Sequence, residues 1–179
     1  MKYKLTENFI IQNNKKLYQI QSLKNFSNVE VGDLGGWIES EKNLSQEGDC
    51  WISDNAIVYG KAFVYGNAQV YGSVKVFGSA EVFGNAKVYH YARVSCNAKV
   101  FDNAEVSGYA RVYGHAQVYG HAQVYNNARV HDAAVVYGEA YVLGSAEVFD
   151  NAEVSGNAEV YGYVKVSGNA RVSDNSFIF

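Results

Sequence analysis

Residues 114–130 read GHAQVYGHAQVYNNARV, in which one hexapeptide occurs twice and a similar third copy follows. The same spacing extends far beyond this stretch. From Ile52 to Ile178 every sixth residue is Val, with Ile at the two ends, over 22 positions. Four residues after each of these comes a small residue, which is Ala at 18 of 21 sites. Self-similarity at a fixed period indicates a repeat architecture, so this period decides the fold.

Each hexapeptide predicts one short strand and one corner. In the order Ala-x-Val-aromatic, Ala and Val point to one side of the strand, and x and the aromatic residue point to the other. The Gly-Asn pair that follows predicts a sharp turn, because both residue types tolerate positive φ. Three six-residue sides make a coil of 18 residues in which Val stacks on Val. We therefore expect an all-β, parallel solenoid of about seven coils, roughly 35 Å long.

The pattern of an aliphatic residue, any three residues, a small residue and any residue resembles the left-handed parallel β-helix of hexapeptide-repeat proteins. The resemblance covers residues 48–179 and implies a left-handed, three-sided helix. It departs from the family's usual pattern in one respect, since Tyr or Phe directly follows the aliphatic residue. The apolar spacing of three and four that a helix needs is absent. The single threonine excludes a threonine-array ice-binding solenoid, and no GGxGxD stretch of a calcium-binding roll occurs.

Residues 1–47 lack the repeat and form a separate N-terminal segment ahead of the solenoid at residues 48–179. Within that segment, FIIQNNKKLYQIQ predicts a hairpin around Asn13 and Asn14. An open solenoid end exposes unpaired strand edges, so we expect residues 1–47 to cap the first coil. Residues 32–52, GDLGGWIESEKNLSQEGDCWI, resemble a stretch that precedes similar repeats in uncharacterised bacterial and prophage proteins, some of which carry a transferase label.

Composition limits the range of functions. The formal net charge is −3, so bulk binding to nucleic acid is not expected and any basic patch must be local. The N-terminus has no apolar signal region, and no stretch approaches the roughly 18–20 apolar residues that span a bilayer. Cys50 and Cys96 in a long chain without a signal sequence predict reduced thiols in a cytoplasmic protein. They form no CxxC or Cys/His cluster, so no metal site is expected. We also expect no cofactor.

The 18-residue period predicts three columns of outward residues, and one column is aromatic. Stacked rings stabilise neighbouring strands, but a continuous strip of them is a larger apolar patch than monomers usually expose. We expect this strip, together with the uncapped final strand, to make a homo-oligomer. The predicted interface residues are Phe63, Tyr65, Phe83, Phe101, Tyr119, Tyr137, Phe177, Ile178 and Phe179.

A second column is basic, and it allows two interpretations. Long arginines cover aromatic rings on an ordinary solvated surface, or they form a site for an anion such as phosphate, a nucleotide, nucleic acid or an acidic protein. The candidate ligand-binding residues are Lys75, Arg93, Arg111, Arg129, Tyr91, Tyr109, Tyr113 and His131. The third column mixes charges of both signs and predicts no function.

His115 and His121 occupy the same corner position of successive hexapeptides. Being six residues apart, they lie at adjacent corners of one coil with diverging side chains, so they cannot share a metal ion. The hexapeptide-repeat resemblance implies another role, because acyltransferases of that family are commonly trimers with a histidine general base and acyl-coenzyme A between subunits. Against this, the register never breaks to provide a loop for a pocket. No GxxxxGK[ST] or GxSxG motif is present.

The sequence therefore favours a non-catalytic binding or scaffold protein that acts through its aromatic and basic faces. The resemblance to prophage proteins implies a narrower version, a phage protein that blocks or sequesters a host defence component. An acyltransferase with a site at a trimer interface, and a structural module that polymerises end to end, are the alternatives.

Overall fold

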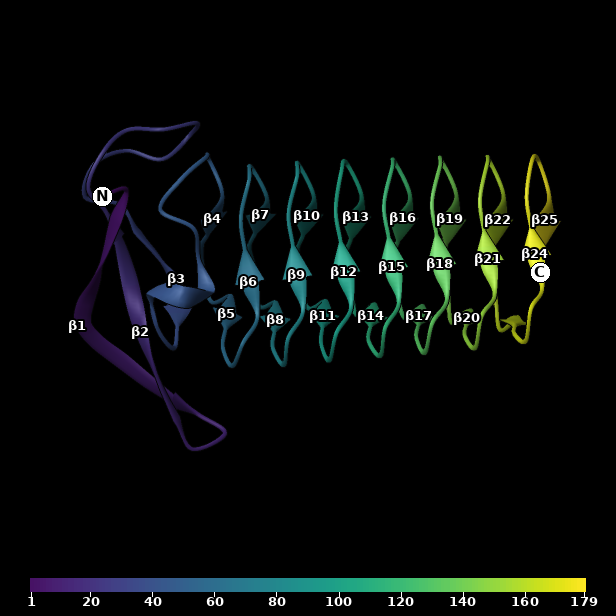
Figure 1. The fold of residues 1–179 in the computed structure, drawn as a ribbon, viewed down its shortest axis with the longest axis horizontal. Coiled ribbons are helices and arrows are strands. Elements are labelled where there is room, and N and C mark those ends of the chain that lie inside the picture. Colours follow the sequence, from purple (N-terminus) through teal and green to yellow (C-terminus); the bar gives the residue numbers. More distant parts are fainter.

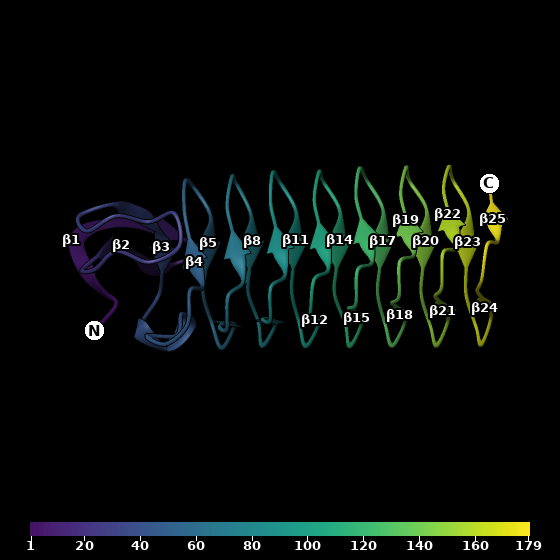
Figure 2. The ribbon, with the colours of Figure 1, turned by 90° about the horizontal axis from the view of Figure 1, so that it is seen from above.

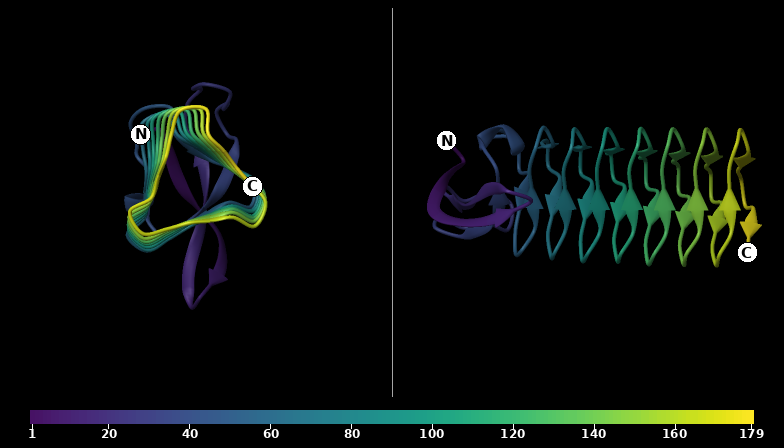
Figure 3. Two further views of the ribbon diagram at one scale, coloured as in Figure 1. Left: turned by 90° about the vertical axis from the view of Figure 1, so that its right-hand side faces the viewer. Right: turned by 90° about the horizontal axis from the view of Figure 1, so that it is seen from below.

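The computed structural model describes all 179 residues as a stack of flat coils with a β-hairpin at one end (Figure 1). Seen from above, the coils succeed one another with even spacing and without insertions (Figure 2). The end-on view shows the coils superimposed on one closed outline, with the hairpin projecting beyond it (Figure 3). The chain contains no α-helix, and one 3-10 turn, η1, spans Glu41–Asn43.

Short parallel strands assemble into three sheets, each of which receives one strand per coil. The sheet that we call the basic face carries the cap strands β1 (Tyr3–Gln12), β2 (Lys15–Ser22) and β3 (Leu34–Ile38), then β5 (Ile57–Val58), β8 (Lys75–Val76), β11 (Arg93–Val94), β14 (Arg111–Val112), β17 (Arg129–Val130), β20 (Glu147–Val148) and β23 (Lys165–Val166).

The second sheet, the aromatic face, contains β6 (Phe63–Val64), β9 (Glu81–Val82), β12 (Lys99–Val100), β15 (Gln117–Val118), β18 (Val135–Val136), β21 (Glu153–Val154) and β24 (Arg171–Val172). The third face contains β4 (Trp51–Ile52), β7 (Gln69–Val70), β10 (Lys87–Val88), β13 (Glu105–Val106), β16 (Gln123–Val124), β19 (Tyr141–Val142), β22 (Glu159–Val160) and β25 (Phe177–Ile178). Paired residues are 18 positions apart, for example Val94 with Val112, which confirms the predicted period.

The interior consists of stacked aliphatic side chains. Every repeat Val and every Ala of the small position from Ala56 to Val160 is fully buried. These residues belong to one continuous apolar cluster of 46 members. Successive coils are also joined by backbone bonds, such as the amide of Arg93 donating to the carbonyl oxygen of Ala110 at 2.9 Å. Each coil is thus held mainly by its two neighbours, as in other solenoids.

The corner geometry corrects one prediction. Positive φ occurs at the position that follows the aromatic residue, for example Gly66 at +69°, and not at the following Asn, so the expectation of positive φ was wrong for that Asn. The Asn residues instead join coils through their side chains, since Asn67 donates to Asn85 and Asn85 to Asn103, both at 3.1 Å. Gly is favoured at this corner position because it adopts positive φ without strain and because an added Cβ would approach the next coil closely, 3.0 Å from the Gly84 nitrogen in the case of Gly66. Asp, Asn, His or Cys occupies the same position on other coils, also with positive φ, as at Asp102 and Asn126.

The N-terminal segment packs against one end of the solenoid. Strands β1 and β2 form the predicted antiparallel hairpin, and its turn residues Asn13 and Asn14 have φ of +49° and +60°. Tyr3 and Ile20 from the hairpin are fully buried in the main apolar cluster. The first coil begins inside residues 1–47, because β3 pairs in parallel with β5 and Leu44 forms a parallel bridge with Val64. With eight strands in the third face, the stack has about eight turns.

A buried lysine fastens the N-terminus to the first coil. Lys2 is 1% exposed, and its Nζ donates to the carbonyl oxygens of Cys50 at 2.8 Å and Gly48 at 3.2 Å. The Cys50 Sγ lies 3.1 Å from the same nitrogen. Burial raises the pKa of the Cys50 thiol, although the nearby ammonium of Lys2 opposes this effect. The ammonium therefore satisfies carbonyl groups that the end of the sheet would otherwise leave without donors.

Glu39 joins the hairpin to the second turn, and this predicts a pH-dependent contribution to stability. Its carboxylate accepts hydrogen bonds from Lys15 Nζ at 2.7 Å and from the Gly60 amide at 2.7 Å. The bond from Lys15 is the main reason why the pKa of Glu39 lies below its ordinary value of 4.5; burial opposes that shift, and the Gly60 amide adds to it.

We expect Glu39→Gln to lower the free energy of unfolding at neutral pH, because it removes the ion pair with Lys15. The loss should be only about 1 kcal/mol, because the side chains of Lys15 and Glu39 are both partly exposed. A carboxyl group whose pKa is lower in the folded than in the unfolded state stabilises the fold at pH values above the unfolded-state pKa. The difference in unfolding free energy between wild type and Glu39→Gln should therefore vanish as the pH falls through the folded-state pKa of Glu39. Urea unfolding at neutral and acid pH measures it, with the exposed Glu7→Gln as control. A difference that persists unchanged in acid would rule out this ionic contribution.

Candidate functional site

The basic face brings its predicted cations into register. Arg93 pairs with Lys75 on the preceding coil and with Arg111 on the following one, and Arg111 pairs in turn with Arg129. Like charges directly opposite each other destabilise a sheet, so this arrangement needs an explanation.

Carboxylates neutralise part of this column but not all of it. Arg129 NH1 lies 3.0 Å from Glu147 Oε1, and Lys165 Nζ lies 3.4 Å from the other oxygen of the same carboxylate. The five outward strand cations that pair with a Glu are Lys87, Lys99, Arg129, Lys165 and Arg171. The three that have no ion pair are Lys75, Arg93 and Arg111, which are consecutive in one column.

Two exposed tyrosines flank these unpaired cations. Tyr91 and Tyr109 occupy the corner that precedes the basic face, are 54% and 61% exposed, and stack with ring centroids 4.9 Å apart. Together with Ser73 and the three cations they line a hollow of about 200 Å³. We call it the basic groove. The predicted ligand residues therefore divide into two sets, of which Lys75, Arg93, Arg111, Tyr91 and Tyr109 share one concave site.

The remaining predicted ligand residues lie apart from this hollow. Arg129 is paired with Glu147, as described above. The ring of His131 lies between Tyr113 and Phe149, with centroid separations of 4.7 and 5.2 Å, and its Nδ1 is 3.1 Å from Asp132 Oδ2. Its side chain is only 16% exposed. Burial is also the main reason why the pKa of Tyr113 is raised. These contacts suit a stabilising stack of rings on the face.

The aromatic face carries the expected ladder of rings. Centroids are 4.7 Å apart from Tyr65 to Phe83, 4.8 Å from Phe83 to Phe101, 4.8 Å from Phe101 to Tyr119 and 5.2 Å from Tyr119 to Tyr137. The rings are half-buried, because stacking covers their faces and leaves mainly their edges to solvent. Phe63 stacks on Tyr65 at 4.9 Å.

Burial, followed by the hydrogen bond to Glu81, raises the pKa of Tyr65 to about 12. The Tyr65 hydroxyl donates to Glu81 Oε2 at 2.9 Å. Stacking of the rings thus stabilises the face, and its use as an interface remains a prediction.

The histidine pair lies where the period predicts. His115 follows β14 and precedes β15, whereas His121 follows β15 and precedes β16, so the two stand at opposite borders of the aromatic face. Both are exposed, and neither side chain makes a hydrogen bond or ion pair within the chain. No cluster of three or more His, Cys, Asp or Glu residues is placed to hold a metal ion.

The final coil presents apolar side chains to solvent. Phe177 and Phe179 are 60% and 82% exposed, and Ile178 is partly exposed although it points toward the interior. Tyr163, at the corner before β23, is 90% exposed. Self-association through these residues stays a prediction.

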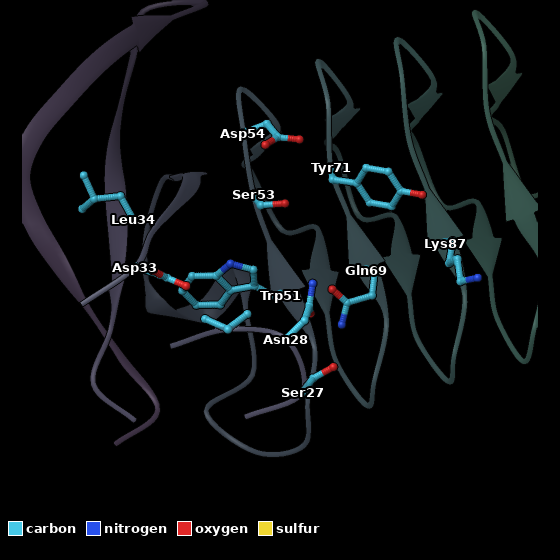
Figure 4. A pocket seen from close by; sticks show the side chains of 11 residues that line it. Ser27, Asn28, Asp33, Leu34, Trp51, Ser53, Asp54, Gln69, Tyr71 and Lys87 are labelled. Atoms are coloured by element: carbon cyan, nitrogen blue, oxygen red, sulfur yellow. The ribbon is translucent and has the colours of Figure 1, made fainter. Parts of the chain in front are cut away.

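One site was missed by the sequence reasoning. A pocket of about 520 Å³ opens on the third face, where the loop before β3 approaches the first coils (Figure 4). It is lined by Ser27, Asn28, Val29, Asp33, Leu34, Trp51, Ser53, Asp54, Gln69, Tyr71 and Lys87. The third outward column, which contains Gln69, Tyr71 and Lys87, has the mixed charges of an ordinary solvated surface and therefore gave no sign of a site. Only the fold of the cap, which brings residues 27–34 beside β4 and β7, creates the cavity.

The repeat, the interior and the sheet register together define a β-solenoid that is built from hexapeptides. Comparison with known proteins agrees, since residues 122–138 match the family described as YdcK β-solenoid repeat. The chain is also 50% identical over 50 residues to a protein of Escherichia coli (strain K12) named "Uncharacterized acetyltransferase YdcK". That match spans 27% of this chain and 15% of the relative. These similarities support a hexapeptide-repeat-like solenoid family. The structure contains no helix with the length and apolar character needed to cross a bilayer.

Proposed function

We propose that this chain is a binding protein whose basic groove holds a phosphate-bearing ligand of nucleotide type. One observation carries the proposal: Lys75, Arg93 and Arg111 follow one another in the column without a carboxylate partner. Cations elsewhere on the outward strand positions have one. An anion bound along the groove would remove the repulsion that the fold otherwise tolerates.

The shape and chemistry of the groove support a nucleotide. Three cations on successive strands span two coil steps, which is about 10 Å and long enough for more than one phosphate group. Guanidinium groups bind phosphate oxygens with two parallel hydrogen bonds, and this suits Arg93 and Arg111. Tyr91 stacks on Tyr109 with one face of its ring, and Ser73 occupies the same corner position one coil earlier. The other face of the Tyr91 ring therefore has no aromatic neighbour. A base can stack on that face, while the net charge of −3 disfavours long nucleic acid.

The test is calorimetric titration with inorganic pyrophosphate and with ADP at low and high ionic strength. Pyrophosphate should bind, and salt should weaken its binding, because the groove is open to solvent. ADP should bind more tightly than pyrophosphate if the tyrosine pair contributes. Failure of both probes to bind at low ionic strength would refute the proposal.

The aromatic face supports a second part of this proposal, in which two copies of the chain associate through it. Its ring ladder runs over five coils, and the edges of the rings reach solvent. The prophage resemblance of residues 32–52 supports a narrower version, in which this chain is a phage protein that blocks or sequesters a host defence component.

An acyltransferase is the second candidate, and the name of the partial relative favours it. His115 and His121 border the aromatic face, so association through that face would bring one of them near a neighbouring subunit. Under this hypothesis the protein should hydrolyse or transfer the acetyl group of acetyl-coenzyme A. His115→Ala or His121→Ala should then reduce turnover by about 100-fold or more, as loss of a general base does. Thiol release measures it, with the solvent-exposed His90→Ala as control. Turnover that survives both substitutions would exclude a histidine base at these corners.

A further inference from the structure

The third face carries a ladder of rings with a gap at one end. Tyr71 and Tyr89 stack with centroids 5.1 Å apart and planes 5° from parallel. On the other side of Tyr71, the residue one coil earlier in the same column is Ser53, because β4 pairs with β7 in that register. Ser53 has no ring, so one face of Tyr71 has no stacking partner.

This gap lies within the pocket of about 520 Å³. In Figure 4 the ring of Tyr71 stands on one side of the pocket and Leu34 on the other, with Ser53 between them. The wall on the Leu34 side comes from the cap, and Leu34 is 52% exposed. Pockets of 300–1,000 Å³ are typical of small-molecule sites, and this volume accommodates a nucleoside.

Polar groups surround the uncovered ring. The side chains of Ser53 and Asn28 make no hydrogen bond within the chain, and both line the pocket. Gln69 Nε2 donates to the carbonyl oxygen of Asp49 at 2.9 Å, which leaves its amide oxygen as an acceptor. Asp54 Oδ2 accepts only the Gly72 amide at 2.8 Å. Donors and acceptors are thus available around the edge of a ring that stacks on Tyr71.

The charges distinguish this pocket from the basic groove. Asp33 and Asp54 both line it, and its one cation, Lys87, is paired with Glu105 at 3.3 Å. Two carboxylates disfavour an anionic ligand. The neighbouring rings indicate what fits, since parallel aromatic rings already stack at this spacing along the same column.

We propose that this pocket binds a neutral nucleoside, whose base stacks on Tyr71 in the space that Ser53 leaves empty. The edge of the base meets the amides of Gln69 and Asn28 and the hydroxyl of Ser53. The site shares no residue with the basic groove and does not depend on the function proposed for it.

The test uses adenosine, guanosine, cytidine and uridine as probes, titrated into the full chain by calorimetry and followed by tryptophan fluorescence, because Trp51 lines the pocket. At least one nucleoside should bind with a dissociation constant below about 1 mM, which corresponds to about −4 kcal/mol. Tyr71→Ala should weaken binding by about 5- to 150-fold, the range for loss of one base–aromatic stack.

Ser53→Phe provides the sharpest variant, because the new ring would complete the ladder and fill the space itself. It should abolish nucleoside binding while the folded state remains at least as stable. Ser107→Phe is the matched control: Ser107 interrupts the same column between Tyr89 and Tyr125 but lies outside the pocket, so binding should be unchanged. Thermal unfolding of both variants reports whether they are folded.

Three results would overturn the proposal. One is that no nucleoside binds the wild-type protein. A second is that Ser53→Phe is folded and binds as well as wild type. The third is that methyl glucoside or another neutral glycoside binds in a Tyr71-dependent manner while nucleosides do not, which would assign the pocket to a sugar. Failure of pyrophosphate to bind the basic groove would refute the function proposed for that groove and would not affect the nucleoside proposal, because the two sites share no residue.

Discussion

Replacing Arg93 and Arg111 together by Glu is expected to weaken pyrophosphate binding by about 100-fold or more. Each hydrogen bond from a charged donor contributes about 1.5–3 kcal/mol, and 1.4 kcal/mol corresponds to a factor of ten in affinity. The substitution removes two guanidinium groups from the groove and adds two negative charges, so repulsion of the anion accompanies the loss of its contacts.

The same substitution should not unfold the protein. In the wild-type sheet the pairs Lys75–Arg93, Arg93–Arg111 and Arg111–Arg129 are all of like charge. After the change, the first and third of these pairs would be of opposite charge. Thermal unfolding should therefore be unchanged or shifted to higher temperature, and this separates loss of a site from loss of the fold.

Lys42→Glu with Lys61→Glu is the matched control for this experiment. Both lysines are exposed, neither has an ion pair, and the net charge changes by the same amount. The control should lower the affinity only modestly, through the long-range field, and high salt should remove that difference. If control and groove variants weaken pyrophosphate binding equally, the anion is attracted by overall charge and the groove has no specific role.

Gly35→Ala is expected to have the largest effect on stability, a loss of about 3 kcal/mol in the free energy of unfolding. A Cβ at this position would stand 2.5 Å from the Ile52 carbonyl oxygen, 2.6 Å from Ile20 Cγ1 and 2.7 Å from Trp51 Cζ2. The Ile52 backbone, the Ile20 side chain and the Trp51 ring cannot all shift enough to make room for the Cβ, so β3 must move away from the first coil. Since β3 connects the cap to the solenoid, Trp51 should become more exposed to solvent.

Urea unfolding combined with tryptophan emission measures both effects. Gly162→Ala is the control, because Gly162 has φ of +78° but an added Cβ meets nothing within 4 Å. That substitution should cost only the strain of a positive φ, about 1 kcal/mol. Equal losses for the two variants would mean that close packing at Gly35 does not hold the cap.

Much of the fold could be predicted because its determinants are local and repeated. The spacing of Val and Ala was sufficient to predict the 18-residue register and the buried interior, and it placed Arg93 beside Arg111 correctly. Handedness rests on family resemblance and stays a prediction. The start of the first coil was harder to predict, because β3 reads as Leu-Gly-Gly-Trp-Ile and has no repeat pattern.

The candidate sites were predictable to the extent that they lie within one column. The register alone is sufficient to place Lys75, Arg93 and Arg111 in one column. It does not predict that Arg129, the next cation of that column, forms an ion pair with Glu147, because this depends on the conformation of the Arg129 side chain. The pocket beside Tyr71 could not be predicted, because one wall comes from residues 27–34. Their position depends on contacts between the cap and the first coil, and no periodicity describes those contacts.

The interior and the surface columns of the solenoid repeat with different periods, and this difference has a genetic consequence. Val and Ala recur every six residues, whereas each outward column recurs every 18. Deletion of one hexapeptide between Arg93 and Arg111 would keep every inward position aliphatic or small. It would also move all later side chains to the preceding face, so that Arg111 would lie on the third face and would no longer follow Arg93. Loss of a whole coil would instead shorten the protein and keep its columns. Insertions or deletions of one or two hexapeptides would therefore preserve the pattern of the core and disrupt the surface columns, whereas those of three hexapeptides would preserve both.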